Sequence, residues 1–374
     1  MGLFNKLFGN GISEELQKSI EQKLVNCLDP ISQRDLLSIK AISDLQLKKD
    51  ELKLKVSMPY PCKSLWPSIE QKLKHELCQI DKVNTLNITF ETAIVAHDAQ
   101  KGVEPLAGIK NIIAIASGKG GVGKSTTSVN LALALQQEGA RVGILDADIY
   151  GPSLPTMLNI KEKPQSTDGK SMQPLEAYGL QVMSIGVLIE EDSPMIWRGP
   201  IVTQTLTQLL KETNWEDLDY LVIDLPPGTG DVQLTLAQKI PVTGAVIVTT
   251  PQQVSIIDAK KGLKMFEKVE IPVLGIIENM GTHICSKCQH EEAIFGEHGG
   301  QEMAKQYDIE FLGGLPLDKR IREEADRGEP TVTADPNSEI AQRYRTMAHK
   351  ISGKIGIQKR NYASLFPNIV IQNT

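Results

Sequence analysis

The chain has 374 residues, of which 41% are hydrophobic and 23% charged, as in a globular protein of two or three domains. Its formal net charge of −6 argues against a nucleic-acid-binding protein. The sequence has neither a signal-peptide-like start nor an apolar run of about 18 residues, so we expect a cytoplasmic protein that does not enter a membrane. Five cysteines, an odd number with one close pair, indicate a reducing compartment and metal or redox chemistry.

Residues 1–96 are expected to form a small α+β domain. Ser13 is a good N-cap for the first helix, which should end before Asp29-Pro30. The elements predicted from periodicity are a helix over residues 13–28, strands over Ile39–Leu47 and Glu51–Val56 joined as a hairpin, a helix over Ser64–Leu77, and a strand over Thr85–Phe90. Cys62, in a proline-rich turn, is expected to be a reactive or transiently metal-binding thiol, and Cys27 and Cys78 to be buried.

Residues 97–109 have no sustained period and are expected to be a linker. Between residues 110 and 358, strongly apolar strands alternate with helices, which predicts an α/β domain with a doubly wound, mostly parallel sheet covered on both faces. The expected strands are Asn111–Ala116, Arg141–Asp146, Tyr220–Asp224, Ala245–Thr249 and Val273–Ile277. Residues 359–374 are expected to be a tail.

The first of these strands leads into a glycine-rich loop that fits the phosphate-binding pattern G-x-x-x-x-G-K-[ST]. The loop reads Gly118-Lys119-Gly120-Gly121-Val122-Gly123-Lys124-Ser125 and is followed by Thr126. Its backbone N–H groups can converge on phosphate oxygens, and the dipole of the following helix adds attraction. Lys124 is expected to reach the β- and γ-phosphates and Ser125 to ligate Mg²⁺. The chain is therefore expected to bind ATP.

Two of the expected strands end in aspartates, where a doubly wound sheet binds its ligand. Asp224 is expected to hold Mg²⁺ through its water shell. Asp146 and Asp148 follow the preceding strand, and one of them is expected to orient the hydrolytic water. Each alone is a weak signal, because aspartates often cap turns. Lys119, a second lysine in the loop, is either a cation that stabilises the transferred phosphoryl group or a surface lysine that attracts ATP.

The glycine loop resembles the deviant phosphate loop of the ParA/MinD/nitrogenase-iron-protein class of dimeric ATPases. Further motifs resemble the Mrp/ApbC iron–sulfur cluster carriers within that class, namely Asp146–Ser153, Trp197–Pro200, Asp224–Asp231 and Glu278–Met280. The N-terminal unit is similar to the metal–sulfur assembly domain that often precedes this ATPase, with Asp29-Pro30 and Pro61-Cys62 at its signature positions. The resemblance covers about residues 13–355.

The resemblance implies a homodimer with ATP bound between the subunits. In such a dimer Lys119 would reach the partner's nucleotide, Asp148 would position the attacking water, and Asn279 would lie near the adenine. The implied catalytic residues are therefore Lys119, Lys124 and Asp148, with Asp224 on the magnesium side. The implied partners are an iron–sulfur assembly scaffold and the apo-proteins that receive the cluster.

Cys285 and Cys288 distinguish the functions within this class. In the carriers a pair so placed supplies two thiolates per subunit, and two subunits give the four ligands of a [4Fe–4S] cluster. Zinc is the alternative, bound by the pair with His283 and His290 or by four cysteines across two subunits. The leading hypothesis is an ATP-dependent carrier that transfers a labile [4Fe–4S] cluster. The alternatives are a ParA/MinD-like dimerisation switch whose cysteines bind zinc, and an electron-transfer ATPase with a stable cluster.

Overall fold

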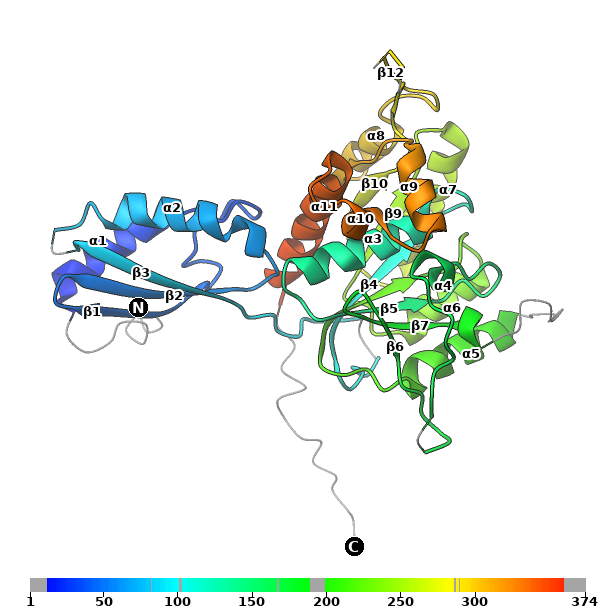
Figure 1. Ribbon diagram of the computed structural model, residues 1–374, viewed down its shortest axis with the longest axis horizontal. Helices are drawn as coiled ribbons and strands as arrows, with labels where there is room; N and C mark the ends of the chain where they lie inside the picture. The colour runs from blue at the N-terminus through cyan, green and yellow to red at the C-terminus, as the bar shows by residue number, and fades with distance from the viewer. Residues whose placement is uncertain are drawn as a thin grey trace, which may run out of the picture. The chain divides into compact units, whose positions relative to one another are not determined.

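The computed structural model describes residues 12–81, 83–100, 103–166, 168–188, 199–285, 287–288 and 290–359. The described chain divides into two compact units, and Figure 1 labels many of their helices and strands. Unit 1 comprises the residues up to Val95, together with Glu138–Ala140 and Ser352–Ile357, and unit 2 comprises the rest from Ala96 onward. The segment 97–109, expected as a linker, groups with unit 2.

Unit 1 is a three-stranded sheet with two helices. Its elements are α1 (Glu14–Val25), β1 (Ile42–Lys48), β2 (Glu51–Met58), the 3-10 turn η2 (Lys63–Leu65), α2 (Trp66–Leu77) and β3 (Thr85–Thr92), which confirms the expected order. The strand order is β1-β2-β3, with β1 antiparallel and β3 parallel to β2. The side chain of Ser13 accepts a hydrogen bond from Leu16 N and caps α1 as predicted. Apolar residues of both helices and the strands form one core.

Two of the three cysteines of unit 1 differ from expectation. Cys62 is fully buried, and burial raises the pKa of its thiol well above the ordinary value. A buried, protonated thiol is neither a good nucleophile nor a metal ligand, so the expectation of a reactive Cys62 is contradicted. Cys78 is exposed, because it is the residue that ends α2, whereas Cys27 is buried as predicted.

Unit 2 is built on an eight-stranded sheet with the order β13-β10-β9-β4-β8-β5-β7-β6, parallel throughout except for the antiparallel pair β6–β7. The expected strands are confirmed as β4 (Ile109–Ala116), β5 (Val142–Asp146), β8 (Leu218–Asp224), β9 (Gly244–Thr249) and β10 (Val273–Glu278). Three further strands were not predicted, β6 (Leu175–Ala177), β7 (Leu180–Ser184) and β13 (Phe311–Gly314). These short strands lie toward the sheet edges, where long apolar runs are not required.

Helices cover this sheet. They are α3 (Lys124–Gln137), α4 (Leu154–Met157), α5 (Gly199–Glu212), α6 (Asp231–Lys239), α7 (Gln253–Lys268), α8 (Gly299–Gln306), α9 (Lys319–Asp326), α10 (Thr331–Ala334) and α11 (Glu339–Gly356), with a 3-10 turn η3 (Ile185–Val187). Apolar residues of α5, α6 and α7 form the main core with the central strands. Figure 1 shows α3 and α10 on the viewer's side of the sheet.

Helix α3 is more deeply enclosed than its sequence indicates. Every residue from Thr127 to Leu135 is buried, on all sides of the helix. The reason is that α3 is enclosed by the sheet and by α4 and α10, which pack against it. No helix of the described residues is long and apolar enough to cross a membrane.

Candidate nucleotide site and cysteine hairpin

The glycine loop lies between the carboxyl end of β4 and the start of α3, the strand–loop–helix arrangement predicted for it. Gly121 and Gly123 have φ of +78° and +80°, in the left-handed region that favours glycine. The amide of Asn279, at the end of β10, donates from Nδ2 to Val122 O at 2.9 Å and holds the loop from behind. A Cβ atom on Gly123 would lie 2.1 Å from that Nδ2 atom. The loop conformation therefore requires glycine at position 123.

We expect Gly123→Ala to lower the free energy of unfolding by about 1–3 kcal/mol and to weaken ATP binding, because it adds both an unfavourable φ and a clash with Asn279. Gly121→Ala separates the effect of the unfavourable φ from that of the clash, because φ at Gly121 is also positive but nothing lies within 4 Å of the added Cβ atom. Gly151→Ala, with neither problem, is the neutral control. Chemical denaturation and nucleotide titration measure both effects. Equal losses in the Gly121 and Gly123 variants would contradict the role given to Asn279.

Lys124, Ser125 and Asp224 come together behind the loop because β4 and β8 are neighbours in the sheet. Lys124 Nζ lies 2.8 Å from Asp224 Oδ1. The Ser125 hydroxyl donates to Asp224 Oδ2 at 2.6 Å. Asp224 is fully buried and Lys124 is only 5% exposed, so the two side chains form a buried ion pair. The Ser125 hydroxyl and the Asp224 carboxylate are oxygen groups of the kind that Mg²⁺ binds.

Asp146, the last residue of β5, and Asp148, which follows the strand, have different environments. Asp146 is fully buried and accepts hydrogen bonds from four groups of the following loop and of β7, namely the backbone N–H groups of Asp148, Ser153 and Leu154 and the hydroxyl of Ser184. Burial, with the neighbouring charge of Asp224, raises the pKa of Asp146 to about 7. These hydrogen bonds hold the loop that carries Asp148.

Asp148 is the aspartate that faces Lys124. Its Oδ2 lies 3.9 Å from Lys124 Nζ. Its Oδ1 is buried without a hydrogen-bond partner among the described residues. Burial raises the pKa of this carboxyl group, and the Lys124 charge opposes that rise. A carboxylate oxygen without a partner, close to a lysine that is expected to bind phosphate, is suited to accept a hydrogen bond from a water molecule.

Sequence reasoning missed two parts of this site. Ser128 donates from Oγ to Asp224 Oδ1 at 2.7 Å, so a second hydroxyl supports the same carboxylate. The spacing of Ser125 and Ser128, one helical turn apart, was the available signal. Gly228 N donates to Ser117 O at 2.9 Å and joins the loop after β8 to the glycine loop. Trp197 and Arg198, from one of the quoted motifs, lie outside the described residues.

Lys119 has a different environment from Lys124. Its side chain is exposed, and no hydrogen bond or ion pair joins its ammonium group to any residue that the structure describes. The apolar side chains of Tyr150, Val254 and Ile257 are also exposed, at 63%, 59% and 53%. Ile257 precedes Asp258, whose backbone lies against Gly118, and Tyr150 follows Asp148, whose carboxylate lies 3.9 Å from Lys124 Nζ. Exposed apolar side chains therefore lie on chain segments that adjoin the glycine loop.

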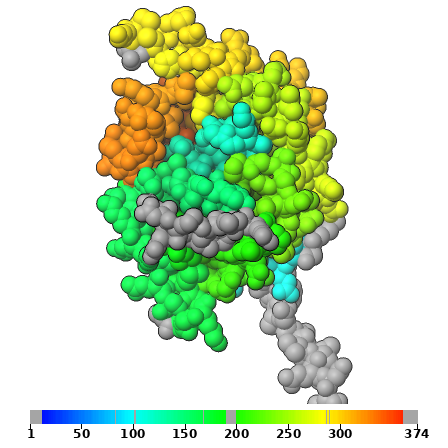
Figure 2. Space-filling model, turned by 90° about the vertical axis from the view of Figure 1, so that its right-hand side faces the viewer, coloured from blue at the N-terminus to red at the C-terminus, as the bar shows by residue number. Residues whose placement is uncertain are grey.

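Cys285 and Cys288 lie at the turn of a short hairpin formed by β11 (His283–Ile284) and β12 (Glu291–Glu292). Cys285 N donates to His290 O at 2.9 Å. Figure 2 shows this yellow segment standing out at the top of the face in view. The backbone N–H groups of Cys288 and Lys287 hold the pKa of Cys285 below its ordinary value, which favours the thiolate form of this side chain.

The histidines beside the hairpin turn do not complete a metal site. His283 Nδ1 lies 2.9 Å from Leu317 O, to which it can donate a hydrogen bond. No three histidine, cysteine or acidic side chains converge on a possible metal position anywhere in the part of the chain that the structure describes. Within the described part of the chain, the two thiols are therefore not joined by a third side chain of these kinds.

Two family models match the chain. A model described as the NUBPL iron-transfer P-loop NTPase, of the ParA type, matches residues 108–352, and one described as an iron–sulfur cluster assembly protein matches residues 17–89. The chain is 48% identical to an iron–sulfur cluster carrier protein of Escherichia coli over 91% of this chain and 93% of that protein. It is 48% identical to the mouse iron–sulfur cluster transfer protein NUBPL over 66% of this chain and 78% of that protein.

Two solved structures match a little under two thirds of the chain. A nucleotide-binding protein of Archaeoglobus fulgidus, in complex with ADP, matches with a TM-score of 0.54 and 36% identity over 63% of this chain and 92% of that chain. The cell division ATPase MinD of Pyrococcus furiosus matches with a TM-score of 0.50 and 22% identity over 65% of this chain and 99% of that chain, which supports the fold alone.

Proposed function

Because the chain belongs to the family of NUBPL iron-transfer P-loop NTPases, we propose that it carries iron–sulfur clusters to apo-proteins and couples ATP hydrolysis to their transfer. The chain is a P-loop ATPase, and its curated relatives are named as cluster carriers or transfer proteins. We further propose that the cargo is a [4Fe–4S] cluster, that the protein acts as a homodimer, and that individual residues of the loop and the hairpin have specific roles. The observation that carries it is an exposed cysteine hairpin in a chain that also holds a complete phosphate loop.

The residues behind the loop fit magnesium and ATP. Ser125 and Asp224 supply the oxygen ligands or water-shell contacts that Mg²⁺ prefers. Lys124, now paired with carboxylates, would gain phosphate oxygens as partners, and the loop N–H groups would hold the phosphates in place. Bound magnesium would supply charge neutralisation at the phosphates. We assign Asp148 the water-positioning role and Asp146 the support of its loop.

Three features support a homodimer with nucleotide at the subunit interface. The ammonium group of Lys119 has no partner within the described chain, as a residue that completes a partner's site requires. Tyr150, Val254 and Ile257 expose apolar side chains on segments that adjoin the loop, and exposed apolar groups of this kind are typical of association surfaces. Third, the cysteine pair of one chain provides half of a four-ligand set.

The cluster is the cargo, and we place it between the Cys285 and Cys288 pairs of two subunits. Thiolates favour soft iron–sulfur clusters, and the lowered pKa of Cys285 prepares that ligand. Asn279 supplies the route of coupling, because it holds Val122 of the phosphate loop while its own chain continues through Met280 to the hairpin. A change of nucleotide that moves Val122 would thereby alter how the hairpins of two subunits approach each other. We also propose that Asn279 lies near the adenine of the bound nucleotide, as the family resemblance implies.

Cys285→Ala is expected to abolish cluster binding, because two subunits would retain only two of four thiolates. Iron, acid-labile sulfide and zinc are measured after anaerobic reconstitution, together with visible absorption. We expect more than about 90% of the iron and sulfide to be lost. Cys78→Ala, which removes an exposed cysteine of unit 1, is the matched control and should bind as wild type.

A Cys285→Ala protein that holds as much iron and sulfide as wild type would overturn the bridging site. Zinc without sulfide in the wild type would instead favour the ATP-driven dimerisation switch. That alternative keeps the phosphate loop and its dimer but carries no cluster.

A further inference from the structure

Unit 2 contains a cavity of about 260 Å³ that the proposed function does not use. It lies at the amino ends of β4, β8 and β9, whereas the phosphate loop follows the carboxyl end of β4. Its walls come from the segment that leads into β4 and from the residues just before β8 and β9. Nucleotide and cluster chemistry therefore take place at the other end of the sheet.

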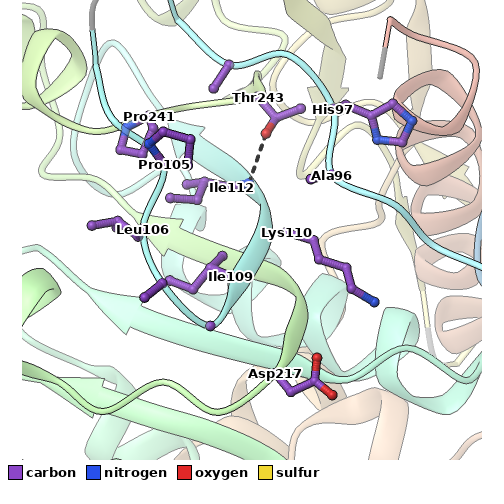
Figure 3. A pocket seen from close by; sticks show the side chains of 13 residues that line it. Ala96, His97, Pro105, Leu106, Ile109, Lys110, Ile112, Asp217, Pro241 and Thr243 are labelled. Carbon is purple, nitrogen blue, oxygen red and sulfur yellow. Dashed lines mark hydrogen bonds between the residues drawn. The ribbon is translucent and has the colours of Figure 1, made fainter. Parts of the chain in front are cut away.

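The cavity is mainly apolar. Figure 3 shows Pro105, Leu106, Ile109 and Pro241 grouped on one side, with His97, Lys110 and Asp217 on the other. The charges at this edge are already paired, Lys110 with Asp219 at 2.8 Å between Nζ and Oδ1, and Asp217 with Arg141. Thr243 Oγ1 accepts a hydrogen bond from Ile112 N at 3.1 Å. An apolar ligand suits this surface better than a charged one.

The chain itself arrives at the edge of this cavity. Lys359 O accepts a hydrogen bond of 3.0 Å from Asp98 N, and Asp98 lies between two lining residues, His97 and Ala99. Residues 360–374, beyond the described part, contain the apolar groups Leu365-Phe366 and Ile369-Val370-Ile371, and Arg360 is their one charged residue. Six extended residues span up to about 20 Å, so Leu365 can reach the cavity from Lys359.

We propose that residues 360–374 bind back into this cavity of the same chain, with Leu365 and Phe366 against Leu106 and Ile109. The attachment at Lys359 keeps the segment at a high effective concentration near its site, so modest apolar contact is enough for binding. The bound segment covers the start of β4. This binding site is independent of the proposed cluster transfer.

Hydrogen–deuterium exchange of the full chain tests the site. In a Leu365→Asp/Phe366→Asp variant, the backbone amides of residues 103–110 should exchange about tenfold faster than in wild type, because the segment no longer covers them. Ser364→Asp/Asn368→Asp adds the same charge at polar positions of the same segment and is the matched control. Unchanged exchange in the first variant, or equal acceleration in both, would overturn the proposal.

A second measurement identifies the occupant. A photoreactive benzophenone side chain at position 366 should cross-link to residues 96–112 or 241–243 of its own chain. A mixture of isotope-labelled and unlabelled protein distinguishes cross-links within one chain from those between two copies. Cross-links only between copies, or only to other surfaces, would overturn binding within the chain.

Discussion

Lys124→Ala is expected to reduce ATP hydrolysis by at least about 10³-fold, as loss of a positioned cation in a phosphoryl-transfer site does. Lys124 is the buried ammonium group of the loop, 2.8 Å from Asp224 and 3.9 Å from Asp148. Without it, the loop loses its charge for the β- and γ-phosphates. Steady-state phosphate release measures the effect. If hydrolysis is coupled to transfer, cluster delivery to an apo-protein falls as well, and normal delivery would contradict the coupling.

The same substitution affects stability, because it leaves the buried Asp224 without its cation. The cost is at most about 3–5 kcal/mol, and the hydrogen bonds from Ser125 and Ser128 reduce it. Lys119→Ala is the informative comparison, since that lysine is exposed and has no partner among the described residues. We expect unchanged thermal unfolding but slower hydrolysis in this variant. Wild-type hydrolysis in Lys119→Ala would remove the argument for a shared nucleotide site.

Asp148→Asn is expected to lower kcat by about 10²–10³-fold while leaving ATP affinity within a few fold. The buried Oδ1 atom of Asp148 has no hydrogen-bond partner in the described chain and is available to orient water. The asparagine amide has the size of the aspartate carboxylate but lacks its charge and its second acceptor oxygen. Nucleotide titration measures the ATP affinity, and single-turnover experiments measure the rate of hydrolysis. A large loss of affinity with unchanged kcat would contradict the assigned role.

Asp146→Asn is the comparison for that variant. Asp146 accepts four hydrogen bonds that fix the loop carrying Asp148. In the asparagine variant the side-chain amide nitrogen, itself a donor, would face these hydrogen-bond donors. We expect this variant to lose stability as well as activity. A normal melting temperature in Asp146→Asn would indicate that the loop is held by other contacts.

The central elements were predictable because they obey local rules. The strands that became β4, β5, β8, β9 and β10 are apolar on both faces, as the middle of a covered parallel sheet requires. Edge strands such as β6 and β13 escaped prediction because three or four residues carry too little periodicity. The enclosure of α3 also escaped it, since burial on all sides depends on helices far away in the sequence.

By itself the sequence determined the phosphate loop, the chain order of the five central strands, and the cysteine pair, because periodicity and spacing along the chain encode each of them. The residues alone left Asp146 and Asp148 as alternatives, and the resemblance favoured Asp148; the tertiary structure supplied the physical reason, since Asp146 is buried against its loop and Asp148 lies near Lys124. It also showed that Cys62 is enclosed and that Cys285 and Cys288 stand on an exposed hairpin without a third ligand in the described chain. Burial and convergence depend on which distant strands become neighbours, and no single stretch of sequence contains that information.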